Sequence, residues 1–211
     1  ACNVPVDEWE LDIVASGSQK GYMIPPGLSF IAMSQKAWEA AEKSNLPKFY
    51  LNLKSYRKSL LTNSNPYTPA VNLVFALDEA LKMMREEGLD NIFQRHNKHK
   101  LAMSNAVKAL NLKLFADEKY LSPSITAIKT EGIDAEEFRK TIKNNFDILL
   151  AGGQDHLKGK IFRVGHLGYV NDRDIITVVS AMSNTLLKLG KISAQQAGEA
   201  LVVASRYLEE N

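Results

Sequence analysis

The residue best suited to covalent chemistry is Lys20, which follows Ser16-Gly17-Ser18-Gln19 and precedes the corner Pro25-Pro26-Gly27. A lysine amine titrates near pH ~10.4 and is a poor nucleophile at neutral pH, but burial disfavours its charged form and can activate it for Schiff-base chemistry. On spacing alone, the more common outcome is a lysine that extends from a strand end into solvent. Local sequence therefore gives a candidate without deciding between these two interpretations.

A second candidate is Arg163, which lies in the apolar run Ile161-Phe162-Arg163-Val164. An unpaired guanidinium among apolar side chains is costly, so we expect an anion beside it. That anion is either a neighbouring Asp or Glu or the carboxylate of a substrate, which the planar fork of arginine can bind through two hydrogen bonds.

Other polar residues are given local roles. His96 and His99 have helical spacing and could share a metal ion, but the cations around them favour a solvated basic face. His156 and His166, in turns on either side of Arg163, are expected to make local hydrogen bonds. The pair Gly152-Gly153 lacks the lysine and hydroxyl of a phosphate loop and is expected to provide flexibility.

The elements that must position these residues follow from apolar spacing and from Gly and Pro. Two buried strands, around Ile13-Val14 and from Leu28 to Met33, are expected to flank Lys20. Expected helices, with their stops and caps, run from Ser34 through Ala41, from Val71 to Gly88, on through Leu110, from Asp134 through Ile142, from Asn171 or Asp172 to Gly190, and from Ser193 to about Leu208. A loop is expected over 63–69 and an alternating strand over 124–128.

The bulk composition excludes several classes of protein. The chain has 211 residues, 45% of them apolar, with 26 Lys and Arg against 24 Asp and Glu, so that its net charge is +2. This balance argues against binding to a nucleic acid backbone, and no apolar run approaches the ~20 residues that span a bilayer. The single cysteine, Cys2, fits a reducing compartment, so a cytoplasmic protein without membrane or nucleic acid partners is expected.

Several separated segments, taken with the Lys20 run, resemble one family: the class V pyridoxal-phosphate-dependent aminotransferases, in the alanine–glyoxylate/serine–glyoxylate branch. The matching segments besides 16–27 are 47–50, 68–69, 87–91, 152–155 and 160–168. This resemblance implies an α/β fold that is the C-terminal portion of a fold-type I transferase. It places the end of the large cofactor-binding domain, with a connecting helix, at 1–88 and a small α+β domain at 89–211.

The resemblance also implies roles for individual residues. Lys20 would anchor pyridoxal 5'-phosphate covalently and move the α-proton of the substrate, with the Gln19 amide near the cofactor phosphate. Thr68 would reach across a homodimer interface to the phosphate in the partner subunit, and Asn65 would stand where many relatives have a second phosphate ligand, a tyrosine. Arg163 would bind the α-carboxylate of a small amino acid or a 2-oxo acid, the two substrates of the reaction.

The same resemblance leaves questions open. Only 19 residues precede Lys20, too few for the parallel sheet on which such a site stands, so we expect a fragment of an aminotransferase that is inactive alone. Desulfuration is not expected, because Cys2 lies upstream and Gln19 replaces the usual histidine, whereas decarboxylation and racemisation stay open. The alternative is a non-catalytic module, hydrogenase-associated or structural, that has retained the fold.

Overall fold

The segment that carries Lys20 joins two antiparallel strands, β1 (Ile13–Gly17) and β2 (Ser29–Met33). The computed structural model describes residues 1–209 and shows both strands only partly buried, with Ile13 61% and Ile31 49% exposed. The expected extended segments are therefore confirmed. The expectation that both are buried is wrong, because this two-stranded sheet has few neighbours in the part of the chain that is described.

Three helices complete the first part of the chain: α1 (Gln35–Lys43), α2 (Leu53–Leu60) and α3 (Val71–Glu87). The expected cap of α1 is present, since the Ser34 side chain accepts a hydrogen bond from the Ala37 amide. The expected loop over 63–69 is also present. These elements belong to one of two compact units, Val4–Glu86, which we call the N-terminal unit.

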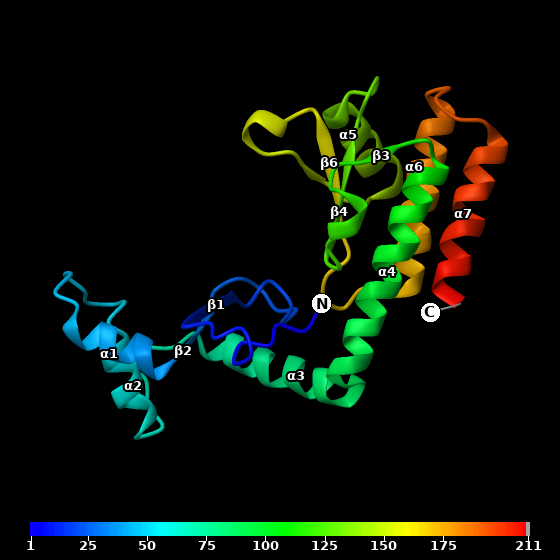
Figure 1. The fold of residues 1–211 in the computed structure, drawn as a ribbon. Helices are drawn as coiled ribbons and strands as arrows, with labels where there is room; N and C mark the ends of the chain where they lie inside the picture. Colours follow the sequence, from blue (N-terminus) through cyan, green and yellow to red (C-terminus); the bar gives the residue numbers. More distant parts are fainter. Residues whose placement is uncertain (210–211) are drawn as a thin grey trace. The chain divides into compact units, whose positions relative to one another are not determined.

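The other compact unit, called the C-terminal unit, comprises Ala1–Asn3 and the chain from Glu87 on (Figure 1). Its helices are α4 (Leu89–Ala109), α5 (Ala135–Phe146), α6 (Asp172–Lys188) and α7 (Ala194–Glu209). Its strands are β3 (Lys113–Leu114), β4 (Ile125–Lys129), β5 (Ala151–Gly152) and β6 (Ile161–Gly165). Two short 3-10 helices, Glu118–Tyr120 and Asp155–Leu157, lie in its loops.

The four strands form an antiparallel sheet in the order β3-β4-β6-β5. Side chains alternate across a strand, so each strand has a buried face and a more open face. Thr126 and Ile128 of β4 and Phe162 and Val164 of β6 are buried, while Arg163 lies on the opposite face. The sheet is therefore covered on one face only by the helices.

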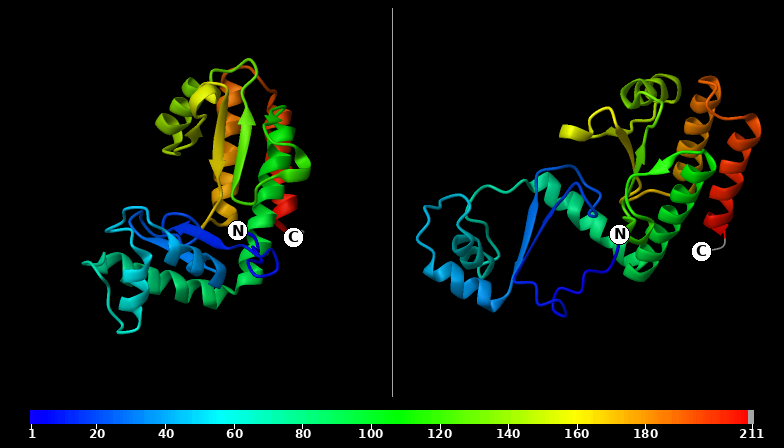
Figure 2. Two further views of the ribbon diagram at one scale, coloured as in Figure 1. Left: turned by 60° about the vertical axis from the view of Figure 1, so that its left-hand side comes forward. Right: turned by 45° about the horizontal axis from the view of Figure 1, so that its top comes forward.

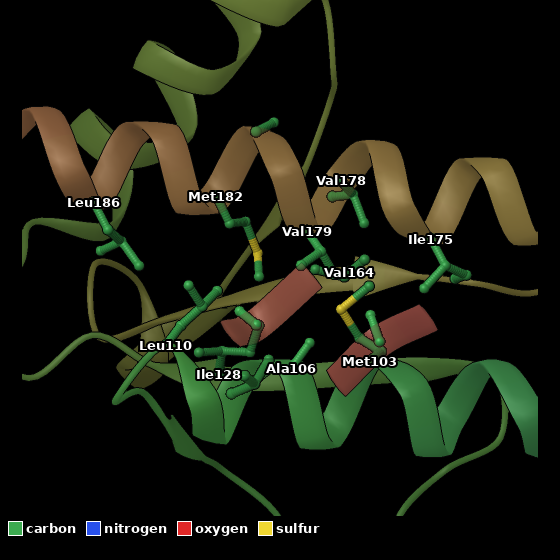
Figure 3. Close-up of a cluster of buried hydrophobic side chains, with 14 of the residues drawn as sticks. Met103, Ala106, Leu110, Ile128, Val164, Ile175, Val178, Val179, Met182 and Leu186 are labelled. Carbon is green, nitrogen blue, oxygen red and sulfur yellow. The ribbon is translucent and has the colours of Figure 1, made fainter. Parts of the chain in front are cut away.

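The core lies between that buried face and the helices. Met103, Ala106 and Leu110 of α4 face Val179 and Met182 of α6 around the strands (Figure 3). Helices α4, α6 and α7 lie side by side (Figure 2), and α5 adds an aromatic contact between Phe138 and Phe162 with ring centroids 5.0 Å apart. This arrangement is a two-layer α/β unit.

Local capping chemistry explains where the later helices begin. The Asp134 side chain accepts hydrogen bonds from the Glu136 and Glu137 amides at the start of α5. Asn171 opens α6 with a complete capping box, and Ser193 with Gln196 forms the reciprocal pair before α7. All three expected helix starts are confirmed.

Gly152 and Gly153 do not provide flexibility, so that expectation is wrong. A Cβ on Gly153 would lie 2.0 Å from the carbonyl oxygen of Leu157, and one on Gly152 would lie 2.6 Å from Nη1 of Arg139. The two glycines are needed because other atoms approach their backbone closely.

Within residues 1–209, the helices are all too short or too polar to cross a membrane.

Candidate active site

Lys20 lies on a tight turn directly after β1. Its backbone amide donates to the carbonyl of Gly17 at 3.1 Å, and its own carbonyl accepts from the amide of Met23 at 3.1 Å. The side chain is exposed, and the amine makes no hydrogen bond or ion pair within the described residues. The expected burial of this amine is therefore wrong for the described residues, and its solvent-facing position leaves it open to another molecule.

Gln19 is exposed beside Lys20 and folds back over the turn. A Cβ on Gly17 would lie 2.8 Å from Oε1 of Gln19, so the glycine gives the Gln19 side chain its space. The amide NH₂ of Gln19 can donate two hydrogen bonds to an anion.

Thr68 and Asn65 are both exposed in the segment between α2 and α3, and neither side chain has a hydrogen bond inside residues 1–209. The neighbouring Tyr67 differs, because its hydroxyl donates to the carbonyl of Phe49 at 3.1 Å. Its ring packs against those of Phe49, Tyr50 and Tyr56 at centroid distances of 4.8 to 6.1 Å. Tyr67 therefore fixes the segment, and the Thr68 hydroxyl stays available to a ligand.

Arg163 projects from the open face of the C-terminal sheet. Its cross-strand neighbours are Ala127 and Ala151, whose small side chains leave space around the guanidinium. Its Nε donates to the carbonyl of Gly152 at 2.9 Å, and no carboxylate of residues 1–209 pairs with it. The expected apolar surroundings are wrong, because the alternation of the strand places Arg163 on the less buried face. The anion expected beside Arg163 is therefore no Asp or Glu among these residues.

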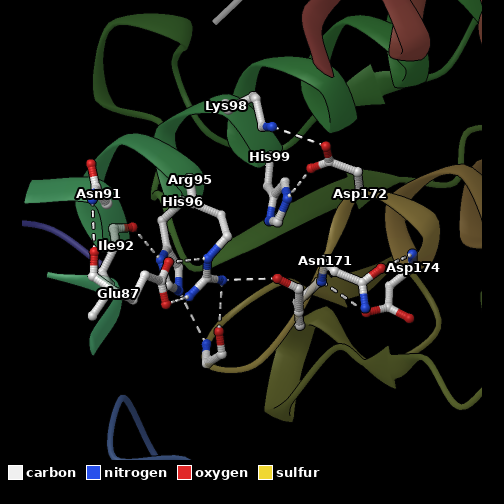
Figure 4. A network of polar contacts seen from close by, with 12 residues as sticks. Glu87, Asn91, Ile92, Arg95, His96, Lys98, His99, Asn171, Asp172 and Asp174 are labelled. Carbon is white, nitrogen blue, oxygen red and sulfur yellow. Dashed lines mark hydrogen bonds and ion pairs between the residues drawn. The ribbon is translucent and has the colours of Figure 1, made fainter. Parts of the chain in front are cut away.

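The loop that follows Arg163 is held by a polar network that the sequence analysis missed (Figure 4). Arg95 forms a bidentate ion pair with Glu87, with Nε to Oε1 at 2.6 Å and Nη2 to Oε2 at 2.9 Å. Its Nη1 also donates to the carbonyls of Gly168 and Val170 at 2.9 and 2.8 Å. The hydrogen bond from Arg95 holds the pKa of Glu87 below its ordinary value.

His96 and His99 belong to this network, so the prediction of a solvated basic face is wrong. They are 2% and 0% exposed, because both lie on the side of α4 that packs against the rest of the unit. His96 donates from Nδ1 to the Ile92 carbonyl at 2.7 Å and accepts at Nε2 from the Gly168 amide at 3.1 Å, while Nε2 of His99 lies 2.9 Å from Asp172. Burial lowers the pKa of both imidazoles, and thus both rings are neutral at pH 7.

His166 makes the local hydrogen bonds that were expected. Its Nδ1 bonds the Pro123 carbonyl at 3.0 Å, and its Nε2 lies 2.9 Å from the Thr126 hydroxyl. Burial of the ring lowers the pKa of His166 to about 4. A sequence signal for these histidines exists only in hindsight, since their partners lie 40 to 73 residues away.

The candidate residues are divided between the two units. Lys20, Gln19, Asn65 and Thr68 belong to the N-terminal unit and Arg163 to the C-terminal unit. Over residues 1–209, the His, Cys, Asp and Glu side chains form no group of three or more that could hold a metal ion.

A fold with an antiparallel α/β unit, preceded by a lysine on a strand-end turn, defines a transferase of the class V aminotransferase type. Residues 2–175 match the family model described as Aminotransferase class-V, and the chain belongs to this family. The predicted family and fold class are thus confirmed.

Particular relatives narrow the resemblance. The chain is 55% identical over 208 residues to the soluble hydrogenase, small subunit, of Synechococcus sp. (strain PCC 6716), which covers 99% of this chain and 54% of that protein. It is 36% identical over 213 residues to the serine–glyoxylate aminotransferase of Methylorubrum extorquens, covering 97% and 52% of the two chains. The crystal structure of ureidoglycine–glyoxylate aminotransferase from Bacillus subtilis matches with a TM-score of 0.86 at 29% identity, over 98% of this chain and 55% of that one. The chain therefore spans about half the length of the curated relatives it matches.

Proposed function

We propose that the protein containing this chain transfers an amino group from a small amino acid to glyoxylate or another 2-oxo acid, with pyridoxal 5'-phosphate as cofactor. The observation that carries the proposal is the Lys20 turn, which presents an amine without a partner among residues 1–209 in a member of the class V aminotransferase family. A relative named serine–glyoxylate aminotransferase supports the choice of substrates.

The residues present fit this cofactor. The Lys20 amine is free to form a covalent bond with its aldehyde, and the exposed Gln19 amide can donate hydrogen bonds to the phosphate. Thr68 and Asn65 can donate to the phosphate held by a partner subunit in a homodimer. When bound, the cofactor supplies the electron sink that lets the α-proton of an amino acid be removed.

The chain's own residues do the remaining work. Arg163 binds the substrate α-carboxylate through its Nη atoms while the Gly152 carbonyl holds Nε, so that the guanidinium is fixed in orientation. Nζ of Lys20 then takes the α-proton and returns it to the other carbon during transfer, as a general base and acid. We place the enzyme in the cytoplasm. We also propose that residues 1–88 end the cofactor-binding domain and 89–211 form the small domain.

The test is transamination by the full-length protein, with serine, alanine or aspartate as donor and glyoxylate as acceptor. Lys20→Ala should abolish turnover, while Lys43→Ala, at an exposed lysine in the last turn of α1, should leave it unchanged. We further propose that the 211-residue chain alone binds the cofactor weakly and does not turn over. A visible absorbance band formed by that chain with the cofactor, and lost in Lys20→Ala, contradicts this last claim.

The second candidate function is a non-catalytic, hydrogenase-associated or structural role. It is favoured by one observation, that relatives at 55% and 57% identity are named as subunits of a soluble hydrogenase. Equimolar co-purification with a hydrogenase, together with no transamination by the full-length protein, supports this function. Turnover that depends on Lys20 excludes a purely structural role.

A further inference from the structure

Ser18 is completely buried, although the next two residues of the chain, Gln19 and Lys20, are exposed. Its Oγ donates a hydrogen bond to the carbonyl of Pro25 at 2.7 Å and accepts one from the amide of Leu28 at 3.1 Å. The Ser18 side chain therefore joins the two sides of the loop that carries Lys20.

The main chain of Ser18 adds two further hydrogen bonds to the same side of the loop. Its amide donates to the Leu28 carbonyl at 3.0 Å, and its carbonyl accepts from the Ile24 amide at 3.3 Å. The strand pairing of β1 with β2 ends at Gly17 and Ser29, so Ser18 continues the contact by one residue and closes the loop. A serine suits this position because a hydroxyl on a single carbon both donates and accepts.

Inside the closed loop, the backbone of Lys20 is fixed by the Gly17 carbonyl and the Met23 amide. The amine itself has no partner within the described residues, so no side-chain contact holds it in place. Its position depends on the loop backbone, and that backbone depends on Ser18.

We propose that Ser18 is a positioning residue for Lys20. It touches neither cofactor nor substrate and acts only through the backbone of residues 18–28. The proposal rests on the proposed function for what Lys20 does to the cofactor. The hold of Ser18 on the loop is independent of that function, which allows the two to be tested separately.

The first experiment measures the loop in the full-length protein without cofactor. Trypsin cleavage after Lys20 is timed under native conditions and divided by cleavage after Lys58 of α2, which corrects for any change in overall stability. Because Ser18→Ala leaves the Pro25 carbonyl and the Leu28 amide without their partner, the ratio should rise about tenfold. Ser16→Ala is the matched control, since Ser16 is half-buried on β1 and its side chain makes no hydrogen bond among residues 1–209. A ratio that is the same in Ser18→Ala and Ser16→Ala overturns the proposal.

The second experiment measures capture of the cofactor. Pyridoxal phosphate is added to the protein, the adduct is reduced with borohydride at set times, and the Lys20 peptide is quantified by mass. Ser18→Ala should form the adduct about tenfold more slowly than wild type, and Ser18→Thr, which retains the hydroxyl, should recover most of the rate. Equal rates in wild type and Ser18→Ala overturn the proposal and leave the proposed function intact. If wild type forms no adduct at Lys20, the proposed function fails, and the cleavage ratio alone decides the role of Ser18.

Discussion

The carbonyl oxygen of Gly152 accepts a hydrogen bond from Nε of Arg163 at 2.9 Å, between two adjacent strands of the C-terminal sheet. Gly152 can stand there only without a side chain, because a Cβ would lie 2.6 Å from Nη1 of Arg139. The bond uses one corner of the guanidinium fork and leaves the Nη atoms for another acceptor. Arg163 is therefore held in orientation without being neutralised by a carboxylate of residues 1–209.

Arg163→Lys should lower kcat/KM for the amino acid about 10- to 100-fold, because an ammonium cannot bind a carboxylate through two parallel bonds while also bonding the Gly152 carbonyl. Steady-state kinetics of the full-length protein measure this effect, which we expect mainly in KM. Arg173→Lys, near the start of α6, is the control and should be neutral. An unchanged KM in Arg163→Lys contradicts the assignment to the substrate carboxylate.

Gly153→Ala should destabilise the protein by about 2–4 kcal/mol, since the new methyl group would need the space of the Leu157 carbonyl at 2.0 Å. The matched control is Gly198→Ala within α7, where a Cβ meets nothing within 4 Å. That change should stabilise the helix by about 0.5–1 kcal/mol. Urea unfolding of both variants gives the comparison, and equal stability of the two rules out the close approach at Gly153.

Helices, caps and the family could be predicted from the sequence because their signals are local. Asp134, Asn171 and Ser193 each cap a helix through atoms two or three residues away. Burial was predicted wrongly for Lys20, His96 and His99, because it depends on segments distant in the chain. Nothing near His96 in the sequence indicates that the amide of Gly168, 72 residues away, will bond its ring.

Arg95→Ala should cost about 3–5 kcal/mol of stability, since it leaves Glu87 without its ion-pair partner and removes donors from the carbonyls of Gly168 and Val170. Urea unfolding measures the total loss. Hydrogen exchange should also show a selective loss of protection at the Gly168 amide, which bonds His96. Arg85→Ala is the control, because Arg85 is exposed on α3 and has no partner among residues 1–209. Equal losses in both variants contradict a specific role for Arg95.

Stability should fall as the pH is lowered below about 6.5, with His166 as the largest contributor. Its pKa is about 4 in the folded chain against 6.5 for an ordinary histidine, so between these values the unfolded chain binds more protons and unfolding becomes easier. The full loss from His166 approaches about 3 kcal/mol by pH 4. His96 and His99, whose pKa values burial also lowers, add in the same direction.

The pH effect is measured by urea unfolding between pH 7.5 and 4.5. His166→Gln should be less stable than wild type at pH 7.5 but should lose less with acid, so that the two curves converge. His156→Gln, at an exposed histidine, should follow the wild-type curve. Parallel curves for wild type and His166→Gln show that another group controls the acid sensitivity.

The two units should differ in independent stability. The large core cluster, including Met103, Phe162 and Met182, lies wholly in the C-terminal unit. In the described residues of the N-terminal unit, only Ile24, Ala37 and Ala80 are buried apolar side chains, and a two-stranded sheet is marginally stable by itself. A chain truncated to begin at Glu87 should therefore unfold cooperatively in urea, because it retains its core. Residues 4–86 expressed alone should show no cooperative transition and should be digested by trypsin within minutes, under conditions where the truncated chain survives. Cooperative unfolding of residues 4–86 would show that the strands flanking Lys20 do not depend on other parts of the protein for their burial.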